Sequence, residues 1–252
     1  LRPILCIAAA ELVEGTETEV MDAACALELV HTYSLIHDDL PAMDDDDFRR
    51  GKPTCHKVFG EATAILAGDA LLTAAFEVLS RVACKRCKDS VDSVYLRIIY
   101  LIARAAGASG MVQGQMMDLA SEKKDISWED LKVLHRLKTG ALIEASLQIG
   151  AILGGGSSQQ VAAVRSYGEH VGLAFQVADD VLDVEGDYSL TGKPVGSDEK
   201  LQKATVPSVL GLETAKACAR DLVDCALKEL RVFGNKGHVL AALAHYVVER
   251  NR

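Results

Sequence analysis

Apolar residues recur at helical spacing along almost the whole chain. In the segment before Asp38, for example, Val30, Leu35 and Ile36 mark the apolar side of a helix. Strand-type alternation is absent, and β-branched residues do not cluster between turn signals. The pattern therefore predicts an all-α fold that forms one domain over residues 1–252, with one continuous core and no linker.

Turn and capping residues divide this pattern into successive helices. Pro3 fits the first turn of a helix, and Thr18 and Ser127 are the expected N-caps of two later ones. Polar loops are expected at 51–60 and 186–205. We expect helices at 3–15, at 18–38, at 62–81, at 91–119, at 127–153, from 158 into the stretch 175–187, at 213–232 and at 237–250.

The composition is that of an ordinary globular protein, with 49% apolar and 25% charged residues. A net charge of −9 argues against nucleic acid as the main partner. No apolar run approaches the roughly 20 residues that cross a bilayer, so we expect no membrane span. Seven cysteines, an odd number, favour reduced thiols in a reducing intracellular compartment, the cytoplasm or a plastid. The chain opens at Leu1 without an initiator Met, so we expect its N-terminus to be incomplete.

The apolar helix that reaches Asp38 turns sharply acidic. Asp38 and Asp39 are adjacent, Pro41 follows, and four consecutive carboxylates occupy 44–47. Two like charges about 4 Å apart repel by about 1 kcal/mol in water and about 4 kcal/mol at an effective dielectric near 20. Such a cluster needs a cation. Hard carboxylate oxygens without soft ligands favour Mg²⁺, which is held by one or two carboxylates plus substrate phosphates.

A second acidic stretch lies at 175–187. Asp179 and Asp183 are four residues apart and share a helix face, with Asp180 beside them. Their neighbours are apolar, and buried carboxylates are usually paired or metal-bound. We expect the two acidic helix ends to face each other across one cleft, where Mg²⁺ ions bridge them to a diphosphate.

A metal-bound diphosphate also needs cationic side chains. Arg49 and Arg50 directly follow the first acidic stretch, which suggests that one serves the metal-bound phosphate and the other a second anion. Arginine binds phosphate oxygens two at a time, whereas lysine acts as a point charge. The other candidates in loops or near helix ends are Arg2, Lys138, Lys193 and Lys203.

The two acidic stretches resemble the motifs of a known family. DDLPAMDDDDFRRGKPT is similar to the first aspartate-rich motif of short-chain trans-isoprenyl diphosphate synthases, and FQVADDVLDVEGD resembles their second motif. LKTG, GQMMDL and the loop with Lys193 and Lys203 also fall in the family's order. The resemblance covers essentially the whole chain and implies a homodimeric, single-domain isoprenoid-synthase bundle around a central cavity.

The activity that the resemblance implies is prenyl transfer. Isopentenyl diphosphate would condense with an allylic diphosphate (dimethylallyl, geranyl or farnesyl) to give farnesyl or geranylgeranyl diphosphate. By the family's pattern, Mg²⁺, with roughly three ions per site, would be bound by Asp38, Asp44 and Asp179, with Asp39, Asp180 and Asp183 beside the same ions. The allylic substrate would be held by Arg49, Lys138, Thr139, Gln176, Lys193 and Lys203. Isopentenyl diphosphate would be held by Arg2, His31 and Arg50.

The expected chemistry passes through an allylic cation. Dipoles such as the Thr139 hydroxyl and the Gln176 carbonyl stabilise a cation without capturing it, so these two residues and Lys138 are the catalytic candidates. No side chain is an evident base, and the released diphosphate is the expected proton acceptor. Tyr33, five residues before Asp38, would floor the apolar tunnel and favour a fifteen-carbon product. If Tyr33 turned aside, the product would reach twenty carbons.

Two other interpretations compete. A terpene cyclase would ionise an allylic diphosphate alone, but its second metal motif is usually of an Asn/Ser/Glu type, and here it is DDVLD. A non-catalytic or regulatory subunit of a heteromeric synthase would keep the fold, but it would be expected to lose metal aspartates, and both sets are present. Of the family's opening GGKR-type motif, only the tail, LRP, is present.

Overall fold

The computed structural model describes residues 1–86, 93–185 and 204–249. Almost all of this part of the chain is helical, and a two-stranded hairpin, β1 (Phe48–Arg49) and β2 (Lys52–Pro53), is the one sheet in it. In chain order the helices are α1 (Arg2–Leu12), α2 (Glu17–Asp38), α3 (Cys55–Phe59), α4 (Glu61–Arg86), α5 (Ser93–Ala106), α6 (Met111–Ser121), α7 (Trp128–His135), the π-helix η1 (Arg136–Gly140), α8 (Ala141–Leu153), α9 (Ser158–Glu185), α12 (Val206–Leu210), α13 (Leu212–Glu229), the 3₁₀ helix η2 (Leu230–Gly237) and α14 (His238–Glu249). The all-α fold class is confirmed.

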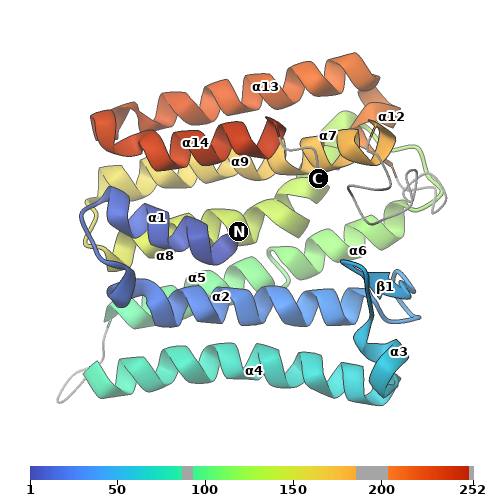
Figure 1. The fold of residues 1–252 in the computed structure, drawn as a ribbon, viewed down its shortest axis with the longest axis horizontal. Coiled ribbons are helices and arrows are strands. Elements are labelled where there is room, and N and C mark those ends of the chain that lie inside the picture. Colours follow the sequence, from blue (N-terminus) through green and yellow to red (C-terminus); the bar gives the residue numbers. More distant parts are fainter. Residues whose placement is uncertain (87–92, 186–203, 250–252) are drawn as a thin grey trace.

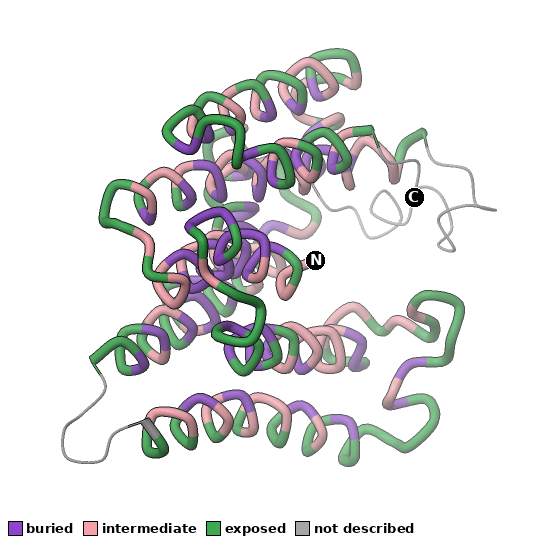
Figure 2. The backbone as a smooth tube through the Cα atoms, turned by 60° about the vertical axis from the view of Figure 1, so that its left-hand side comes forward, coloured by how far each residue is buried: buried purple, intermediate pink, exposed green. Residues whose placement is uncertain are grey.

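The helices pack as layers around a central pair. α13 and α14 lie along one side, followed by α9, by α1 and α8, by α2, and by α4 at the opposite edge (Figure 1). One apolar cluster joins α1 and α8 to α9, α13 and α14, and a second joins them to α2, α4 and α5. Buried positions are concentrated where these layers meet (Figure 2). Fully buried leucines such as Leu5, Leu27 and Leu147 each contribute about 2 kcal/mol of burial free energy.

Three local expectations are corrected. The N-cap of α2 is Thr16 rather than Thr18, because Thr16 and Glu19 bond reciprocally in a capping box. The segment 51–60 is not a plain loop, since it contains β2 and α3. The helix expected at 91–119 is broken at Gly107–Gly110, where a Cβ on Gly110 would lie 2.1 Å from the Ala105 carbonyl oxygen.

Helix α4 is unusual in its exposure. Within the segment Glu61–Lys85, the most apolar 18-residue window has a mean hydropathy of 1.6, yet only 22% of that window is buried. By length and composition alone this segment could cross a bilayer, so the absence of a membrane span stays a prediction. Exposed apolar side chains include Ile65 and Leu66 on α4 itself, Val58 and Phe59 on α3, and Leu96 and Tyr100 on α5.

Candidate active site

The first acidic stretch lies where α2 ends and the chain turns back as a small hairpin. Arg49 pairs with Lys52, so Arg50 and Gly51 form a two-residue turn. Both have positive φ, 52° and 74°, which is the type I′ geometry that matches the twist of a hairpin. Left-handed backbone is costly for a residue other than glycine, and strain of this kind is typical of functional positions. The turn holds Arg50 exposed beside the end of α2.

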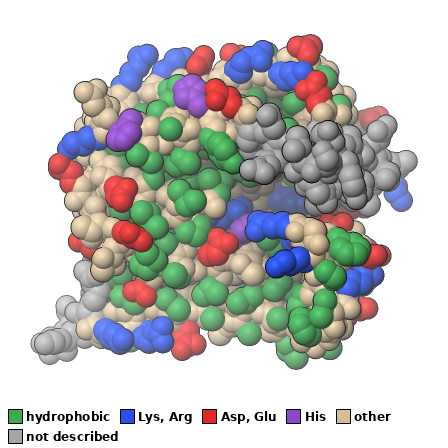
Figure 3. Space-filling model, in the orientation of Figure 1, with side chains coloured by type: hydrophobic (Ala, Val, Ile, Leu, Met, Phe, Trp, Pro, Cys, Tyr) green, Lys and Arg blue, Asp and Glu red, His purple; other side chains and the backbone are tan. Residues whose placement is uncertain are grey.

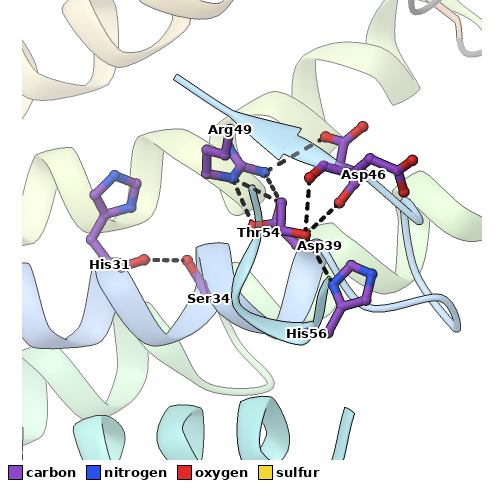
Figure 4. Close-up of polar contacts among 8 residues, drawn as sticks. His31, Ser34, Asp39, Asp46, Arg49, Thr54 and His56 are labelled. Carbon is purple, nitrogen blue, oxygen red and sulfur yellow. Dashed lines mark hydrogen bonds and ion pairs between the residues drawn. The ribbon is translucent and has the colours of Figure 1, made fainter. Parts of the chain in front are cut away.

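The carboxylate of Asp39 is almost fully buried and is held by Arg49. Asp39 is 3% exposed, and the Arg49 Nε donates to its Oδ1 and Oδ2 at 2.8 and 3.1 Å. Arg49 Nη2 lies 2.6 Å from the same Oδ1 (Figure 4). Burial by itself would lower the pKa of Arg49. The hydrogen bonds to Asp39 and the carboxylate charge outweigh this and raise the pKa above its ordinary value, so the guanidinium stays charged. Asp39 therefore anchors the hairpin to the end of α2.

A threonine fixes the acidic loop from its other side. Thr54 Oγ1 donates to the Asp46 carbonyl oxygen at 2.8 Å, and its backbone N–H donates to the Asp47 carbonyl oxygen at 3.0 Å. The same hydroxyl lies 3.2 Å from His56 Nδ1 (Figure 4). The exposed side chain of Asp47 pairs with Lys57 at 2.6 Å, as expected of a solvated loop charge. The loop geometry is thus set by backbone acceptors rather than by the carboxylates.

His31 lies within a group of arginines. Burial, together with neighbouring positive charges, lowers the pKa of His31 to about 3. The arginines responsible are Arg2, Arg50 and Arg49. The imidazole is therefore neutral at pH 7. This group, which we call the cationic cluster, unites the three residues expected to bind isopentenyl diphosphate.

Arg2 is the most deeply placed member of the cationic cluster. Burial lowers the pKa of Arg2 to about 10, while Glu28 opposes the shift. Its buried Nε has no hydrogen-bond partner among the described residues. A buried charged donor without an acceptor is costly, and a bound anion would remove that cost.

The second acidic stretch forms the C-terminal part of α9. Asp180 is 3% exposed, and three groups surround its carboxylate. Gln176 Nε2 donates to Oδ1 at 3.0 Å, and the Val206 backbone N–H donates to Oδ2 at 2.8 Å. His135 Nε2 lies 3.4 Å from the same Oδ2. Asp180 therefore ties α9 both to α7 and to the start of α12.

A hydrogen-bond chain leads from Asp180 to the expected catalytic groups. The amide of Gln176 donates to Asp180 and, through Oε1, accepts from Thr139 Oγ1 at 3.0 Å. Thr139 belongs to the π-helix η1, and π-helical turns are frequent at functional sites. The structure thus brings Thr139 and Gln176 together as expected.

Two glycines allow η1 to sit between its neighbours. A Cβ on Gly114 of α6 would lie 2.2 Å from the Lys138 backbone N, and one on Gly172 of α9 would lie 3.0 Å from the Gly140 Cα. The close approach lets Lys138 Nζ reach Asp118 Oδ2 at 2.6 Å. Both side chains of this pair are more than half buried, so the ammonium is held in a fixed direction.

Three residues of this region were missed by the sequence reasoning. Asp118 is the partner of Lys138, and Gln115 and His135 each have a buried nitrogen without a hydrogen-bond partner in the part of the chain described. The GQMMDL segment does contain Gln115 and Asp118, but no charge pattern there distinguishes them from an ordinary helix surface. His135 directly precedes η1, and only its burial singles it out.

The remaining acidic side chains are half-buried. Asp38 and Asp44 lie at the end of α2, and Asp179 and Asp183 lie at the end of α9. Among the residues described, no group of three or more His, Cys, Asp or Glu side chains is placed to hold a metal ion. The metal-binding role of these aspartates therefore stays a prediction.

The two acidic helix ends lie at the same end of the molecule. α2 and α9 run in the same direction, and both views place their C-terminal ends on one side (Figures 1 and 2). On this face the surface is hollowed between the two halves, and blue and purple side chains gather at the hollow (Figure 3). We call the α2–hairpin side wall one and the η1–α9 side wall two. Lys193 and Lys203 lie outside the described residues.

Known proteins resemble this chain over its whole length. The Polyprenyl synthetase family model matches residues 1–244. The chain is 48% identical over 257 residues to a farnesyl diphosphate synthase of Escherichia coli, covering 100% of this chain and 85% of that protein. It is 46% identical over 252 residues to a geranylgeranyl diphosphate synthase of Cyanophora paradoxa, covering 100% and 83%.

Solved structures give the same picture. A farnesyl/geranylfarnesyl diphosphate (FPP/GFPP) synthase of Zymomonas mobilis has a TM-score of 0.87 at 42% identity, over 98% of this chain and 83% of that one. A geranyltransferase of Helicobacter pylori, solved with magnesium and isoprenyl diphosphate, has a TM-score of 0.83 at 34% identity, over 98% and 81%.

Proposed function

Because the chain belongs to the polyprenyl synthetase family, we propose that it condenses isopentenyl diphosphate with an allylic diphosphate. The allylic substrate is dimethylallyl, geranyl or farnesyl diphosphate, and the product is farnesyl or geranylgeranyl diphosphate. The observation that carries this is the pairing of a cationic cluster on wall one with neutral, fixed dipoles on wall two. A regulatory subunit is disfavoured, because both aspartate pairs are retained and the relatives described above are named as synthases or as a transferase.

Magnesium is the cofactor of this family, and the half-buried carboxylates suit it. Asp38 and Asp44 on wall one, with Asp179 and Asp183 on wall two, would hold the ions, about three per site. When bound, Mg²⁺ stabilises the negative charge that develops on the departing diphosphate. Asp39 and Asp180 would act beside the ions rather than on them, because their oxygens already accept protein donors.

Wall two stabilises the reacting carbon. The Thr139 hydroxyl oxygen and the Gln176 carbonyl oxygen present partial negative charge, which stabilises an allylic cation without forming a bond to it. The Lys138 ammonium, fixed by Asp118, is directed to the allylic diphosphate. Arg49 supports the same diphosphate from wall one, and Lys193 and Lys203 are proposed to complete that site.

Wall one binds the second substrate. Arg2, His31 and Arg50 form a site for isopentenyl diphosphate, in which the buried Arg2 Nε gains an acceptor. The allylic carbon–oxygen bond breaks to leave the cation, and the double bond of isopentenyl diphosphate then attacks it. The released diphosphate takes the proton that the condensed cation loses when the new double bond forms.

Product length is proposed to depend on Tyr33. Its ring is 8% exposed and packs edge-on against His37 with centroids 5.7 Å apart, one turn before Asp38. Burial raises the pKa of Tyr33, and the charge of Asp38 raises it further, so the hydroxyl is close to the acidic helix end. This position supports a tunnel floor and a fifteen-carbon product. Tyr33→Ala should lengthen the product; unchanged length by chromatography would exclude Tyr33 as the floor.

The exposed apolar face of α4 and α5 is proposed to pack against a second copy of the chain. Ile65 and Leu66 of α4 and Leu96 and Tyr100 of α5 are each more than 40% exposed, which is costly for a face of this size. Light scattering should give twice the monomer mass, and Leu66→Glu should give the monomer. A monomeric wild type would contradict the homodimer.

The compartment is proposed to be reducing, either cytoplasm or plastid. Relatives include a farnesyl diphosphate synthase of Escherichia coli and a chloroplastic geranylgeranyl pyrophosphate synthase of Arabidopsis thaliana. All cysteines among the described residues are free thiols.

One assay tests the proposed function. The protein is incubated with Mg²⁺, labelled isopentenyl diphosphate and each allylic starter in turn, and the products are sized. We expect elongation that stops when EDTA removes the metal. No elongation with any starter would leave the non-catalytic subunit as the better interpretation.

A further inference from the structure

His135 is a buried polar residue to which neither the motifs nor the proposed mechanism gives a role. It is the last residue of α7, it is 6% exposed, and it directly precedes η1. Its Nε2 has no hydrogen-bond partner in the described chain, and the nearest acidic oxygen is Asp180 Oδ2 at 3.4 Å. A buried ring nitrogen without a partner is rare, and each case calls for an explanation.

The imidazole stands at one end of a chain of hydrogen bonds that reaches the reacting region. Asp180 accepts from Gln176 Nε2 at 3.0 Å, and Gln176 Oε1 accepts from Thr139 Oγ1 at 3.0 Å. His135 directly precedes η1 and Thr139 lies within it, four residues further on, so the series of contacts returns to the segment where it begins. The four side chains come from three elements and form one connected unit, which we call the relay.

The contact between Gln176 and Asp180 determines which end of the Gln176 amide faces Thr139. An amide presents a donor at one end and an acceptor at the other, and a half-turn exchanges them. With Asp180 ionised and in place, the amide nitrogen must point to it, so the carbonyl oxygen points to Thr139. If the Asp180 side chain rotated away, the Gln176 amide could turn by half a turn. Its nitrogen could then face Thr139, and the negative end of the dipole would no longer point to the cation.

We propose that His135 is a positioning residue for prenyl transfer, which holds the Asp180 carboxylate so that the Gln176 and Thr139 dipoles point at the allylic carbon. The backbone N–H of Val206 alone fixes only one direction of the Asp180 carboxylate. An N–H on His135 Nε2 would supply a second direction, and we expect its 3.4 Å separation from Asp180 Oδ2 to shorten when substrate fills the site. This role rests on the proposed prenyl transfer.

The test compares three variants with the wild type. His135→Leu keeps most of the volume and removes the donor, and His135→Gln returns a donor at similar reach. Leu134→Met changes the neighbouring buried side chain, which has no polar group, and is the matched control. For each we would measure kcat, KM for both substrates, the unfolding temperature, and the ratio of prenyl alcohol, formed when water captures the cation, to elongated product.

The proposal predicts how each variant changes kcat, KM and the alcohol fraction. His135→Leu should lower kcat about tenfold, less than the roughly 10²- to 10³-fold typical of removing a direct donor. It should leave KM for isopentenyl diphosphate unchanged and raise the alcohol fraction. His135→Gln should recover most of both losses, and Leu134→Met should resemble the wild type.

A double-mutant cycle separates positioning from a merely structural effect. If His135 acts through the relay, then His135→Leu combined with Thr139→Val should be no slower than Thr139→Val alone, because both changes break one unit. Losses that multiply, or an unchanged kcat and alcohol fraction in His135→Leu, would overturn the proposal. If His135→Leu fails to fold, His135→Asn, which is polar but too short, serves in its place. If one of these contrary results is found while the wild type elongates its substrates, only this inference has failed. If the wild type itself does not elongate, both this inference and the proposed function are overturned.

Discussion

The two walls of the hollow each bury one aspartate, but they satisfy it differently. On wall one, Asp39 is held by a single cation, Arg49, through contacts of 2.6 to 3.1 Å. On wall two, Asp180 is surrounded by neutral donors, an amide and a backbone N–H, with an imidazole at 3.4 Å. Wall one thus gathers positive charge, whereas wall two presents dipoles.

This difference matches the two tasks of prenyl transfer. A diphosphate needs full positive charge around it, and the arginines near His31 provide it. A carbocation needs stabilisation by groups that do not capture it, and the Thr139–Gln176 pair provides that. In the same molecule, charge is placed where anions bind and dipoles where the cation forms.

The largest effect is expected for the one cation placed on wall two. Lys138→Met should lower kcat by about 10²- to 10³-fold, because it removes the fixed positive charge that we propose to serve the departing diphosphate. Steady-state kinetics measure this. Lys132→Met, which changes a more exposed lysine on the preceding helix, is the control and should leave kcat unchanged. Equal losses in both variants would contradict the assignment.

Arg49→Met on wall one should lower the free energy of unfolding more than Gln176→Met does on wall two. Within the described residues Arg49 is the cation paired with buried Asp39, so its removal should lower the free energy of unfolding by about 3 kcal/mol. Gln176→Met should cost less, about 1 kcal/mol, because the Val206 N–H still donates to Asp180. Urea unfolding measures both. A larger loss for Gln176→Met would reverse the comparison.

Gly114→Ala should disturb wall two alone. Its Cβ would meet the Lys138 backbone N at 2.2 Å, so η1 must move and kcat should fall about tenfold. Gly140→Ala is the matched control, because its Cβ would meet nothing closer than 3.7 Å. The affinity of the cationic cluster for diphosphate, measured by calorimetry, should be the same in both variants. Equal kcat values would show that η1 tolerates displacement.

Much of the fold was readable from the sequence, because helical periodicity and capping residues are local signals. The order of helices and the ends near Asp38 and Ser158 followed from them. The hairpin at Arg50–Gly51 and the helix α3 were not predicted, since a run of four aspartates followed by Gly and Pro looks like a solvated loop. The break at Gly107–Gly110 was also missed, although it is local: a Cβ on either glycine would meet a carbonyl oxygen of the turn just before it.

The sequence predicted which residues gather at the two acidic helix ends, and the family resemblance placed Asp38 and Asp179 on the ions with Asp39 and Asp180 beside them. It did not predict the contacts of Asp39 and Asp180. Burial separates these two, which anchor the walls, from the two that remain half-buried. Asp118 lies within GQMMDL and His135 lies just before LKTG, but neither motif pointed to their contacts, which only the packing around η1 shows.

The smallest expected effect concerns the pH dependence of wall one. The pKa of His31 is lowered from about 6.5 in the unfolded chain to about 3 in the folded protein, so the unfolded state binds more protons between these values. The stability that a neutral His31 provides is complete above pH 6.5 and declines as the pH falls toward 3. When the pH is lowered from 7 to 5, His31→Asn should therefore lose less stability than the wild type. Thermal unfolding at each pH measures this. Parallel curves would contradict the burial of His31 among arginines.

The central claim is that both walls act on one bound diphosphate, and a kinetic cycle with Asp38→Asn and Asp179→Asn tests it most directly. Each single variant should lose most of kcat, and the double variant should be little slower than the worse single one, because either change disables the same unit. If instead the two losses multiply, or if either variant retains wild-type kcat, the walls do not share a leaving group and the account is wrong.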